Sequence, residues 1–299
     1  MRSLVVGAAI IDMRLEIPAL PERGGDVYCS KADMMVGGCA YNVAVTLRNM
    51  GVEHDLCVPV GVGNYADVIS AELRRLGYDV LVRDGSADNG FCLALVDAEG
   101  ERTFITYPGV EGSFKREWLD SLDMSRYDFI YVVGYQVCDE AGGGAVADWL
   151  LGQGDKTVFF APGPVFTSIP VSVVDRILSV RPVLHLNDKE ACDFTGESEV
   201  ARAAEALYAR THNTVIITLG EGGCAWFDGE ALRTAPAVGT SVVDTIGAGD
   251  SHVAAVIGCL SRGYSLERSM VYANRVASGI VGISGPVMDR ADFRAFMGE

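Results

Sequence analysis

The sequence predicts an α/β protein with a mostly parallel central sheet that helices cover on both faces. Two observations lead to this prediction: several apolar runs contain almost no polar residue, and amphipathic stretches alternate with them. A strand with both faces buried is apolar at nearly every position, whereas a strand with one wet face alternates. Alternation of such strands with helices is typical of parallel sheets. The 299 residues suffice for one such domain with a large core.

The apolar runs place the strands, and the helical spacing between them places the helices. Strands are expected at Leu4–Ile11, Asp55–Val60, Phe129–Val133, Thr157–Phe160, Val183–Leu186 and Val215–Leu219. Helices are expected at Ala40–Met50, Tyr65–Leu76, Ala141–Leu151, Pro170–Val180, Val200–Arg210 and Ser251–Ser261. The sequence contains no internal repeat, low-complexity tract or linker. We therefore expect a single domain over residues 1–299.

Two regions break this alternation, residues from about 13 to 36 and from about 88 to 110. The second region reads as a hairpin, with strands at Gly90–Val96 and Arg102–Tyr107 around a turn at 97–100. Both regions are too short for a core of their own. We expect them to form a small β lid beside the main sheet, inserted into the domain. The alternative is that they only decorate the surface.

Composition and charge exclude several classes of protein. Hydrophobic residues are 49% of the chain and charged residues 21%, which is ordinary for a globular protein. The formal net charge of −16 repels nucleic acid and anionic membranes, so neither is expected as a partner. The eight scattered cysteines indicate reduced thiols rather than disulfides or a metal site. The first apolar run is too short to span a bilayer, and we expect a cytoplasmic protein.

Residues 244–250, Asp-Thr-Ile-Gly-Ala-Gly-Asp, precede an apolar helix and are the most informative stretch. Gly247 and Gly249 allow a sharp turn into the helix, whose first amides and dipole form a site for an anion. Asp250 is expected at the helix N-cap. A carboxylate beside an anion site suits phosphoryl transfer, because it accepts the proton of an attacking hydroxyl. Alone, the motif also fits an ordinary N-cap after a glycine-rich turn.

The full heptad resembles the C-terminal signature of the ribokinase-like (PfkB-type) carbohydrate kinases. Four further elements of that family appear in the expected order: Asp12, Gly37–Asn42, Asn187–Glu190 and Ile217–Gly223. The resemblance covers essentially the whole chain. It implies a three-layer α/β/α domain with a β lid, and an enzyme that uses ATP and Mg²⁺ to phosphorylate a hydroxyl of a sugar or nucleoside.

The resemblance also implies roles for individual residues. Asp250 is expected to be the catalytic base, and the amides of Gly247, Ala248 and Gly249 the anion hole. Residues expected to bind the substrate are Asp12, Gly38, Asn42 and Gln136. Residues expected on the nucleotide side are Asn187, Thr218, Gly220, Gly223 and Asn274.

Two metal ions follow from the same resemblance. Glu190 is expected to act on Mg²⁺ through water, since this ion gives up its hydration shell reluctantly. Several relatives also need a monovalent cation beside the anion hole. The corresponding groups for K⁺ are Asp244 and the backbone carbonyls of Ile246, Ile280, Ile283 and Gly285.

Two departures from the family pattern bear on the substrate. His252 stands where phenylalanine is more usual, and we expect it to pack like that residue. The loop after Gly38 lacks a glycine found in ribokinases proper, which argues against ribose itself. A ketohexose, an acid sugar, a pentose and a nucleoside all remain open. A homodimer through the lid is also expected.

Three functions compete on this sequence. The first is an ATP-dependent kinase for a sugar or sugar-like molecule, or a nucleoside kinase of the same family. The second is a sugar- or nucleotide-sensing protein on the same fold, which would be expected to lose Asp250 or Glu190. The third, a nucleotide-dependent oxidoreductase, is disfavoured because residues 7–12 lack the Gly-x-Gly-x-x-Gly turn.

Overall fold

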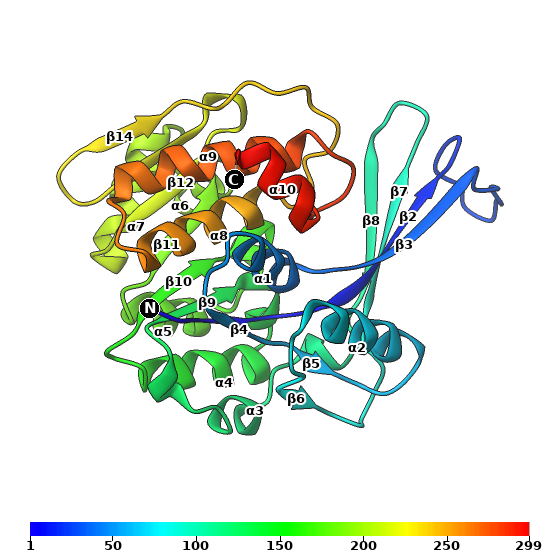
Figure 1. Ribbon diagram of the computed structural model, residues 1–299, viewed down its shortest axis with the longest axis horizontal. Coiled ribbons are helices and arrows are strands. Elements are labelled where there is room, and N and C mark those ends of the chain that lie inside the picture. Colours follow the sequence, from blue (N-terminus) through cyan, green and yellow to red (C-terminus); the bar gives the residue numbers. More distant parts are fainter. Residues whose placement is uncertain (299) are drawn as a thin grey trace.

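The computed structural model describes residues 1–298, and its centre is an eight-stranded sheet (Figure 1). The strand order is β14-β13-β12-β11-β10-β9-β1-β4. All neighbours run parallel except at the β14 edge, where β12, β13 and β14 pair antiparallel. The strands are β1 (Ser3–Val6), β4 (His54–Cys57), β9 (Phe129–Val133), β10 (Thr157–Ala161), β11 (Val183–Asn187), β12 (Val215–Thr218), β13 (Cys224–Phe227) and β14 (Leu232–Ala235).

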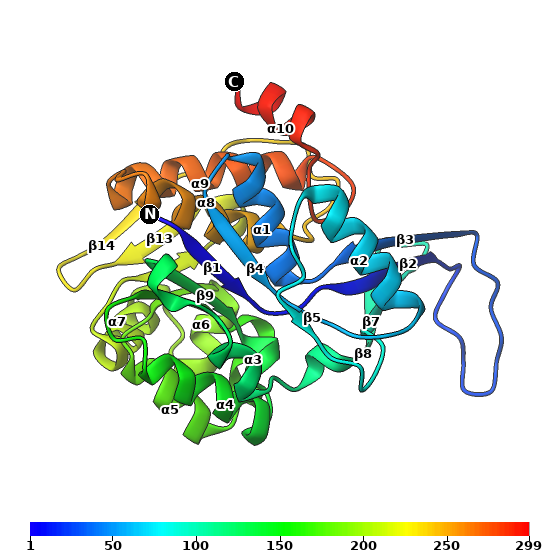
Figure 2. The same ribbon diagram turned by 60° about the horizontal axis from the view of Figure 1, so that its bottom comes forward.

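Helices cover both faces of this sheet (Figures 1 and 2). One face carries α1 (Cys39–Asn49), α8 (Ala248–Ser261) and α9 (Leu266–Val281), with α10 (Arg290–Met297) packed on that layer. The other face carries α3 (Arg116–Asp120), α4 (Glu140–Leu151), α5 (Val171–Ser179), α6 (Asp188–Thr195) and α7 (Val200–Thr211). The predicted three-layer α/β/α fold with a mostly parallel sheet is confirmed.

The side chains of each central strand alternate between the two helical layers. In β9, Phe129 and Tyr131 pack in the core under α1, α8 and α9, whereas Ile130 and Val132 pack in the core under α3 to α7. Successive side chains of a strand point to opposite faces, so both faces of this strand demand apolar residues. This double burial explains why the strands appear in the sequence as unbroken apolar runs.

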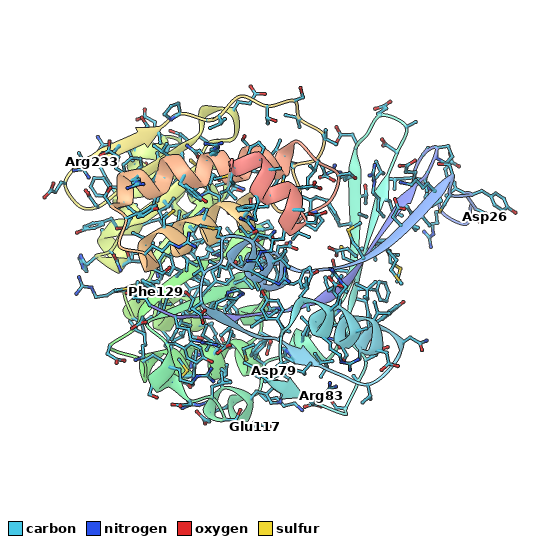
Figure 3. The ribbon with its side chains drawn as sticks, viewed as in Figure 1. Asp26, Asp79, Arg83, Glu117, Phe129 and Arg233 are labelled. Carbon is cyan, nitrogen blue, oxygen red and sulfur yellow. The ribbon has the colours of Figure 1, made fainter. Side chains whose placement is uncertain are left out.

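A second, four-stranded sheet forms the predicted lid and projects to one side of the main body (Figure 1). Its order is β3-β2-β7-β8, and β2 and β7 run parallel. The strands are β2 (Ile10–Glu16), β3 (Lys31–Gly37), β7 (Phe91–Val96) and β8 (Arg102–Tyr107). The predicted hairpin is present, because β7 and β8 pair antiparallel. Asp26, in the loop after β2, and Arg233, on β14, lie at opposite ends of the molecule (Figure 3).

A helix and a small strand pair lie where the lid meets the body. The helix is α2 (Asn64–Leu76), which packs against β2, β3 and β5. The strand pair consists of β5 (Pro59–Val60) and β6 (Val82–Arg83).

Two predicted strands are each divided in the structure. The run Leu4–Ile11 belongs to β1 in the main sheet and to β2 in the lid, with a crossing at residues 7–9. A Cβ atom on Gly7 would lie 2.6 Å from the Cβ of Ala40, so glycine permits the close passage there. Asp12 consequently lies in the lid rather than at the end of the first strand. The run Asp55–Val60 is likewise divided between β4 and β5. Both pieces are buried in each case, so hydrophobicity does not reveal the break.

The start of α8 also differs from the prediction. The helix begins at Ala248 rather than Ser251, and its N-cap is Gly247, which has a left-handed backbone with φ of 77°. Asp250 therefore occupies the third helical position and not the N-cap. Gly249 is the second residue of the helix and not part of the turn, and of the two glycines Gly247 alone has the left-handed backbone that glycine favours.

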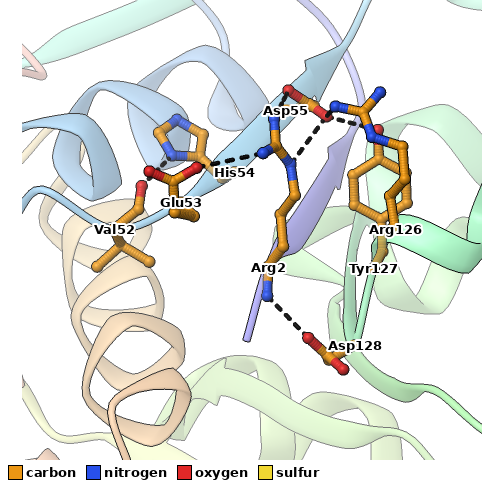
Figure 4. Close-up of polar contacts among 8 residues, drawn as sticks. All are labelled: Arg2, Val52, Glu53, His54, Asp55, Arg126, Tyr127 and Asp128. Atoms are coloured by element: carbon orange, nitrogen blue, oxygen red, sulfur yellow. Dashed lines mark hydrogen bonds and ion pairs between the residues drawn. The ribbon is translucent and has the colours of Figure 1, made fainter.

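The end of the sheet opposite the lid crossing carries a polar cluster of its own (Figure 4). The guanidinium of Arg2 donates to both carboxylate oxygens of Asp55, at 3.1 Å and 2.6 Å. Tyr127 also donates to Asp55, at 2.6 Å, and Arg126 lies 3.3 Å from it. This cluster links the segments that lead into β1, β4 and β9 at their amino ends.

Two features of the fold bear on the earlier expectations about thiols and membranes. All eight cysteines are unpaired. None of the helices within residues 1–298 combines the length and apolar character that crossing a bilayer requires.

Candidate active site

A cavity of about 620 Å³ lies between the lid and the main body. Its walls come from the inner face of the lid, from the segments that follow β1 and β9, and from the start of α8. The carboxyl ends of parallel strands are where α/β proteins bind ligands. The cavity brings together most of the residues predicted for substrate and catalysis: Asp12, Gly38, Asn42, Gln136, Gly247 and Asp250.

Asp250 is the carboxylate at the centre of this group. Asn42 donates its side-chain amide to Asp250 Oδ2 at 2.8 Å, and the thiol of Cys39 also bonds to the carboxylate. Burial raises the pKa of Asp250 to about 6, although the bonds from Asn42 and Cys39 oppose that shift; the charge of Glu190 adds to it. A carboxyl group with this pKa holds a proton weakly near neutral pH, which suits a general base.

Asp12 faces the same cavity from β2. Burial and, after it, the nearby charge of Asp250 together raise its pKa to about 6. The backbone of Gly37 makes room for this carboxylate, because a Cβ atom there would collide with Asp12 Oδ2. Gly38 has a φ of 100°, and a Cβ on it would approach the carbonyl oxygen of Ala8 to 2.8 Å. Two carboxylates with raised pKa in one cavity are typical of a functional site.

Two side-chain oxygens in the cavity wall lack a partner within the described residues 1–298. They are Oδ1 of Asn42 and Oε1 of Gln136, and both residues are about 95% buried. A buried acceptor without a donor costs free energy, so each such atom requires an explanation. Hydroxyl groups of a bound ligand would supply the donors.

The residues predicted for the nucleotide lie outside this cavity, at the adjoining strand ends. Asn187 and Thr218 are direct neighbours across β11 and β12. Gly220 is exposed, whereas Gly223 is buried with a φ of 88° against the segment after β14, where a Cβ would collide with Ala235. Thus four predicted nucleotide residues gather at the end of the sheet where β11 and β12 finish.

Glu190 and Asn187 form a reciprocal cap at the start of α6. Asn187 Oδ1 accepts from the Glu190 amide at 2.8 Å, and Glu190 Oε2 accepts from the Asn187 amide at 3.0 Å. Burial raises the pKa of Glu190. Within residues 1–298, no three His, Cys, Asp or Glu side chains are grouped to hold a metal ion. Glu190 alone would have to reach Mg²⁺ through water, with phosphate oxygens supplying the other ligands.

Asn274 and His252 lie in a buried polar chain instead of a ligand pocket. The Asn274 amide donates to the carbonyls of Ala235 and Pro236, each at 3.0 Å, and its Oδ1 lies 3.2 Å from His252 Nε2. The other ring nitrogen of His252 lies 2.9 Å from His185 Nε2. Asn274 therefore has no free group to offer adenine. His252 is buried, as expected for a substitute of phenylalanine, but it also bonds to two neighbours.

Asp244 is bound by a residue that the sequence did not point to. Arg102, from strand β8 of the lid, lies 2.9 Å from Asp244 Oδ1. The same oxygen accepts the amide of Ile246 at 2.9 Å, and Oδ2 accepts that of Gly285 at 3.4 Å. The carboxylate that was predicted to hold K⁺ is thus occupied by protein donors. In this arrangement the Asp244 carboxylate, already paired with Arg102, does not fit a bound K⁺.

The remaining two predicted K⁺ positions, Ile280 in the last turn of α9 and Ile283 just after it, contact each other. The carbonyl oxygen of Ile280 accepts the amide of Ile283 at 3.1 Å. No spacing signal identified Arg102, because it lies about 140 residues before Asp244 and contacts it only through the lid.

Glu111 is a second residue that the sequence did not reveal. It is buried beside the cavity, and its carboxylate accepts the amides of Gly90 and Gly109 and the side chain of Asn89. Asn89 in turn bonds to Gly61. These bonds clamp the base of the β7–β8 hairpin to the body.

Comparison with known proteins finds matches over most of the chain. The family model described as pfkB family carbohydrate kinase matches residues 2–289. The chain is 37% identical over 286 residues to the uncharacterized sugar kinase YegV of Escherichia coli (strain K12), covering 94% of this chain and 89% of that protein. It is 23% identical over 300 residues to mouse ketohexokinase, covering 94% and 96%.

Solved structures show the same fold. Ribokinase from Thermotoga maritima matches with a TM-score of 0.86 at 24% identity, over 100% of this chain and 99% of that one. Arabidopsis thaliana ribokinase, solved with ribose and ATP, matches with a TM-score of 0.82 at 20% identity, over 99% and 98%. Because the family model matches nearly the whole chain, the chain belongs to the pfkB family of carbohydrate kinases.

Proposed function

We propose that this carbohydrate kinase transfers the γ-phosphoryl group of ATP to a hydroxyl of a sugar or sugar-like small molecule, with Asp250 as the base. The observation that carries the proposal is the placement of Asp250. Its carboxylate lies in the first turn of α8, is oriented by Asn42 at 2.8 Å, and shares one cavity with Asp12. The start of a helix favours the negative charge that moves during phosphoryl transfer.

The residues divide the reaction between them. Asp250 takes the hydroxyl proton as the acceptor oxygen bonds to the γ-phosphorus, and the bond from that phosphorus to the bridging oxygen breaks with its electron pair leaving on ADP. The amides at Gly247, Ala248 and Gly249 stabilise the charge on the transferred group. Within residues 1–298 the amide N–H of Ala248 makes only a long bond, 3.3 Å to the carbonyl of Thr245.

The cavity wall favours a substrate with several hydroxyl groups. Asp12, Asn42 Oδ1 and Gln136 Oε1 are all acceptors, and the two amide oxygens have no partner among the described residues. A ligand that donates hydrogen bonds at three points would satisfy them, and Gly38 lets it approach the backbone.

ATP would lie along the ends of β11 and β12. Asn187, Thr218, Gly220 and Gly223 gather there, and related proteins of this fold have been solved with ATP or ADP. Glu190 would position Mg²⁺ through water; the ion would draw charge from the phosphates. Asn274 is not part of this site, because its side-chain amide is already bonded within the protein.

The experiment is a panel of sugars, sugar acids, polyols and nucleosides, with ADP release as the readout. We expect one polyhydroxylated acceptor to raise ADP release well above the background with water, and Asp250→Asn to abolish that rise. Asp55→Asn, which removes a carboxylate at the other end of the sheet, should retain turnover per folded molecule. Full turnover in Asp250→Asn would refute the role of the base. Acceleration by nucleosides alone would assign the enzyme to that substrate class.

We further propose that two copies pair through their lids in the cytoplasm. Ile105 and Tyr107 are more than half exposed on β8, and Tyr28 is 87% exposed on the lid loop. Exposed apolar side chains on a sheet edge are better buried against a partner. Light scattering should give a dimer for the intact chain and a monomer for Ile105→Asp. Eight unpaired thiols are consistent with a reducing compartment.

A further inference from the structure

Asp244 is the point at which three separate segments meet. Its carboxylate accepts the Ile246 amide at 2.9 Å, which ties down the loop before α8. It also accepts the Gly285 amide at 3.4 Å, from the loop after α9. The third contact is Arg102, 2.9 Å away on strand β8 of the lid. One side chain thus joins the anion-site loop, a neighbouring loop and the lid.

The position of Asp244 requires a nearby positive charge. The residue is only 5% exposed, and an unpaired carboxylate in such surroundings is strongly disfavoured. It also lies three residues before Gly247, the N-cap of α8, where the transferred phosphoryl group would bring further negative charge. A bare carboxylate there would oppose the charge that the helix amides are placed to stabilise.

We propose that Arg102 is the built-in cation of this site, a guanidinium that stands where a monovalent metal ion would otherwise neutralise Asp244. It acts as a positioning residue, because it holds Asp244 and through it the loop 244–247. The inference rests on the proposed phosphoryl-transfer role of α8. Arg102 belongs to the lid and Asp244 to the body, so the pair forms only when the lid covers the cavity. Covering the substrate and ordering the anion-site loop are then one event.

Arginine suits this task better than lysine would. Its planar guanidinium offers several N–H groups in fixed directions and stays charged at all relevant pH values. A second lid arginine, Arg14, faces the same cavity and donates to Ser284 Oγ at 3.3 Å. Its ion pair is with Glu16 at 3.4 Å and not with Asp244. Arg14 is therefore a matched control that removes one positive charge from the same face.

The test is thermal unfolding of the full chain in KCl, NaCl and choline chloride at equal ionic strength, which needs no substrate. We expect the Tm of the wild type to be the same in KCl and NaCl. Arg102→Gln should lower the Tm in all three salts and add a saturable recovery in KCl, since ligand binding to the folded state raises stability. Arg102→Lys and Arg14→Gln should show no response specific to K⁺. Asp244→Asn combined with Arg102→Gln should abolish the recovery.

Kinetics give a second readout once an acceptor has been found. Arg102→Gln should lower kcat in NaCl with little change in KM for the acceptor, and KCl should restore much of the loss. The wild type should turn over equally in both salts. A KM increase without a change in kcat would mean that Arg102 binds substrate instead, and it would overturn the inference.

Other outcomes also contradict the proposal. A K⁺-specific rise in the Tm of the wild type would show that the ion binds alongside Arg102. Failure of Arg102→Gln to respond to K⁺, or to fold in its presence, would show that no ion replaces the guanidinium. If the acceptor panel finds no substrate, the proposed function fails, whereas the thermal comparison still decides whether Arg102 replaces a cation.

Discussion

Two carboxylates at opposite ends of the same sheet have opposite environments. Asp55, near the amino ends of β1, β4 and β9, is surrounded by donors (Figure 4). Burial alone would raise its pKa, but the hydrogen bonds from Arg2 and Tyr127 outweigh burial and lower it. Asp250 lies near the carboxyl ends, and its partners within residues 1–298 are the Asn42 amide and the Cys39 thiol. Burial raises its pKa to about 6.

The difference distinguishes Asp55, a carboxylate that stabilises the fold, from Asp250, a carboxylate that is available to react. Asp55 has a matching guanidinium and does not line the cavity, and its charge helps to hold three strands together. Asp250 and Asp12 face a cavity and lie near each other's charge, which costs stability. A protein tolerates such a cost where function needs the group. The following predictions test this contrast.

Asp250→Asn should have the largest effect on catalysis. We expect kcat to fall roughly 10²–10⁴-fold, the range typical for loss of a general base. The folded state should be at least as stable as the wild type, because the buried charge is gone. ATP binding, followed by thermal shift with ATP and Mg²⁺, should persist. A large loss of Tm with intact kcat would place Asp250 in the same class as Asp55.

The contribution to stability should change with pH in opposite directions for the carboxylates at the two ends of the sheet. Asp250 must be ionised to act, so kcat/KM should fall about tenfold per pH unit below its pKa of about 6. The folded pKa values of Asp250 and Asp12 are raised, so the folded state binds more protons than the unfolded chain between about pH 4 and 6. Their contribution to stability is therefore lost as pH rises through that window.

Asp55 has a lowered pKa, so its stabilising contribution is lost only as pH falls below its ordinary value of 3.8. Comparing the Tm of the wild type with that of Asp12→Asn/Asp250→Asn from pH 4 to 7 isolates the first effect. Parallel curves for the two proteins would contradict the raised pKa values.

Asp55→Asn should reduce stability and leave catalysis intact. The change removes the charge that pairs with Arg2, leaves Arg2 its exposed pair with Glu53, and weakens the bond from Tyr127 in a half-buried setting. We expect a loss of about 2–3 kcal/mol in the free energy of unfolding. Denaturant titration measures it. Asp120→Asn removes the exposed pair with Arg116 and should cost only about 0.5 kcal/mol. Equal losses in the two variants would deny the Asp55 cluster its structural role.

His252→Phe should have the smallest effect, and it tests a polar group close to the site but fully bonded. His252 lies two residues after Asp250, yet its ring nitrogens contact His185 and Asn274. We expect it to behave like Asp55, with a loss of about 1–2 kcal/mol from the orphaned partners and little change in kcat. Adding His185→Leu should recover part of the loss. A large fall in kcat would show that the hydrogen-bonded series His185–His252–Asn274 contributes to catalysis.

Much of this protein was predictable from local sequence. The strands Phe129–Val133 and Val183–Leu186 appear almost as expected, because burial on both faces favours an apolar residue at nearly every position. The motif at 244–250 predicted an anion site at a helix start, since the positions of Gly247 and Asp250 are local along the chain. The order of the family elements then predicted the three-layer fold.

Tertiary structure alone decided the rest. The division of Leu4–Ile11 between two sheets depends on the close passage of Gly7 past Ala40, and hydrophobicity is the same on either side of it. The pairing of Arg102 with Asp244 and the internal bonding of Asn274 arise between residues far apart in sequence. Sequence determines which groups are available, because composition and spacing are local properties. Which group meets which, and whether a carboxylate keeps a proton, depends on distances and burial that exist only once the chain has folded.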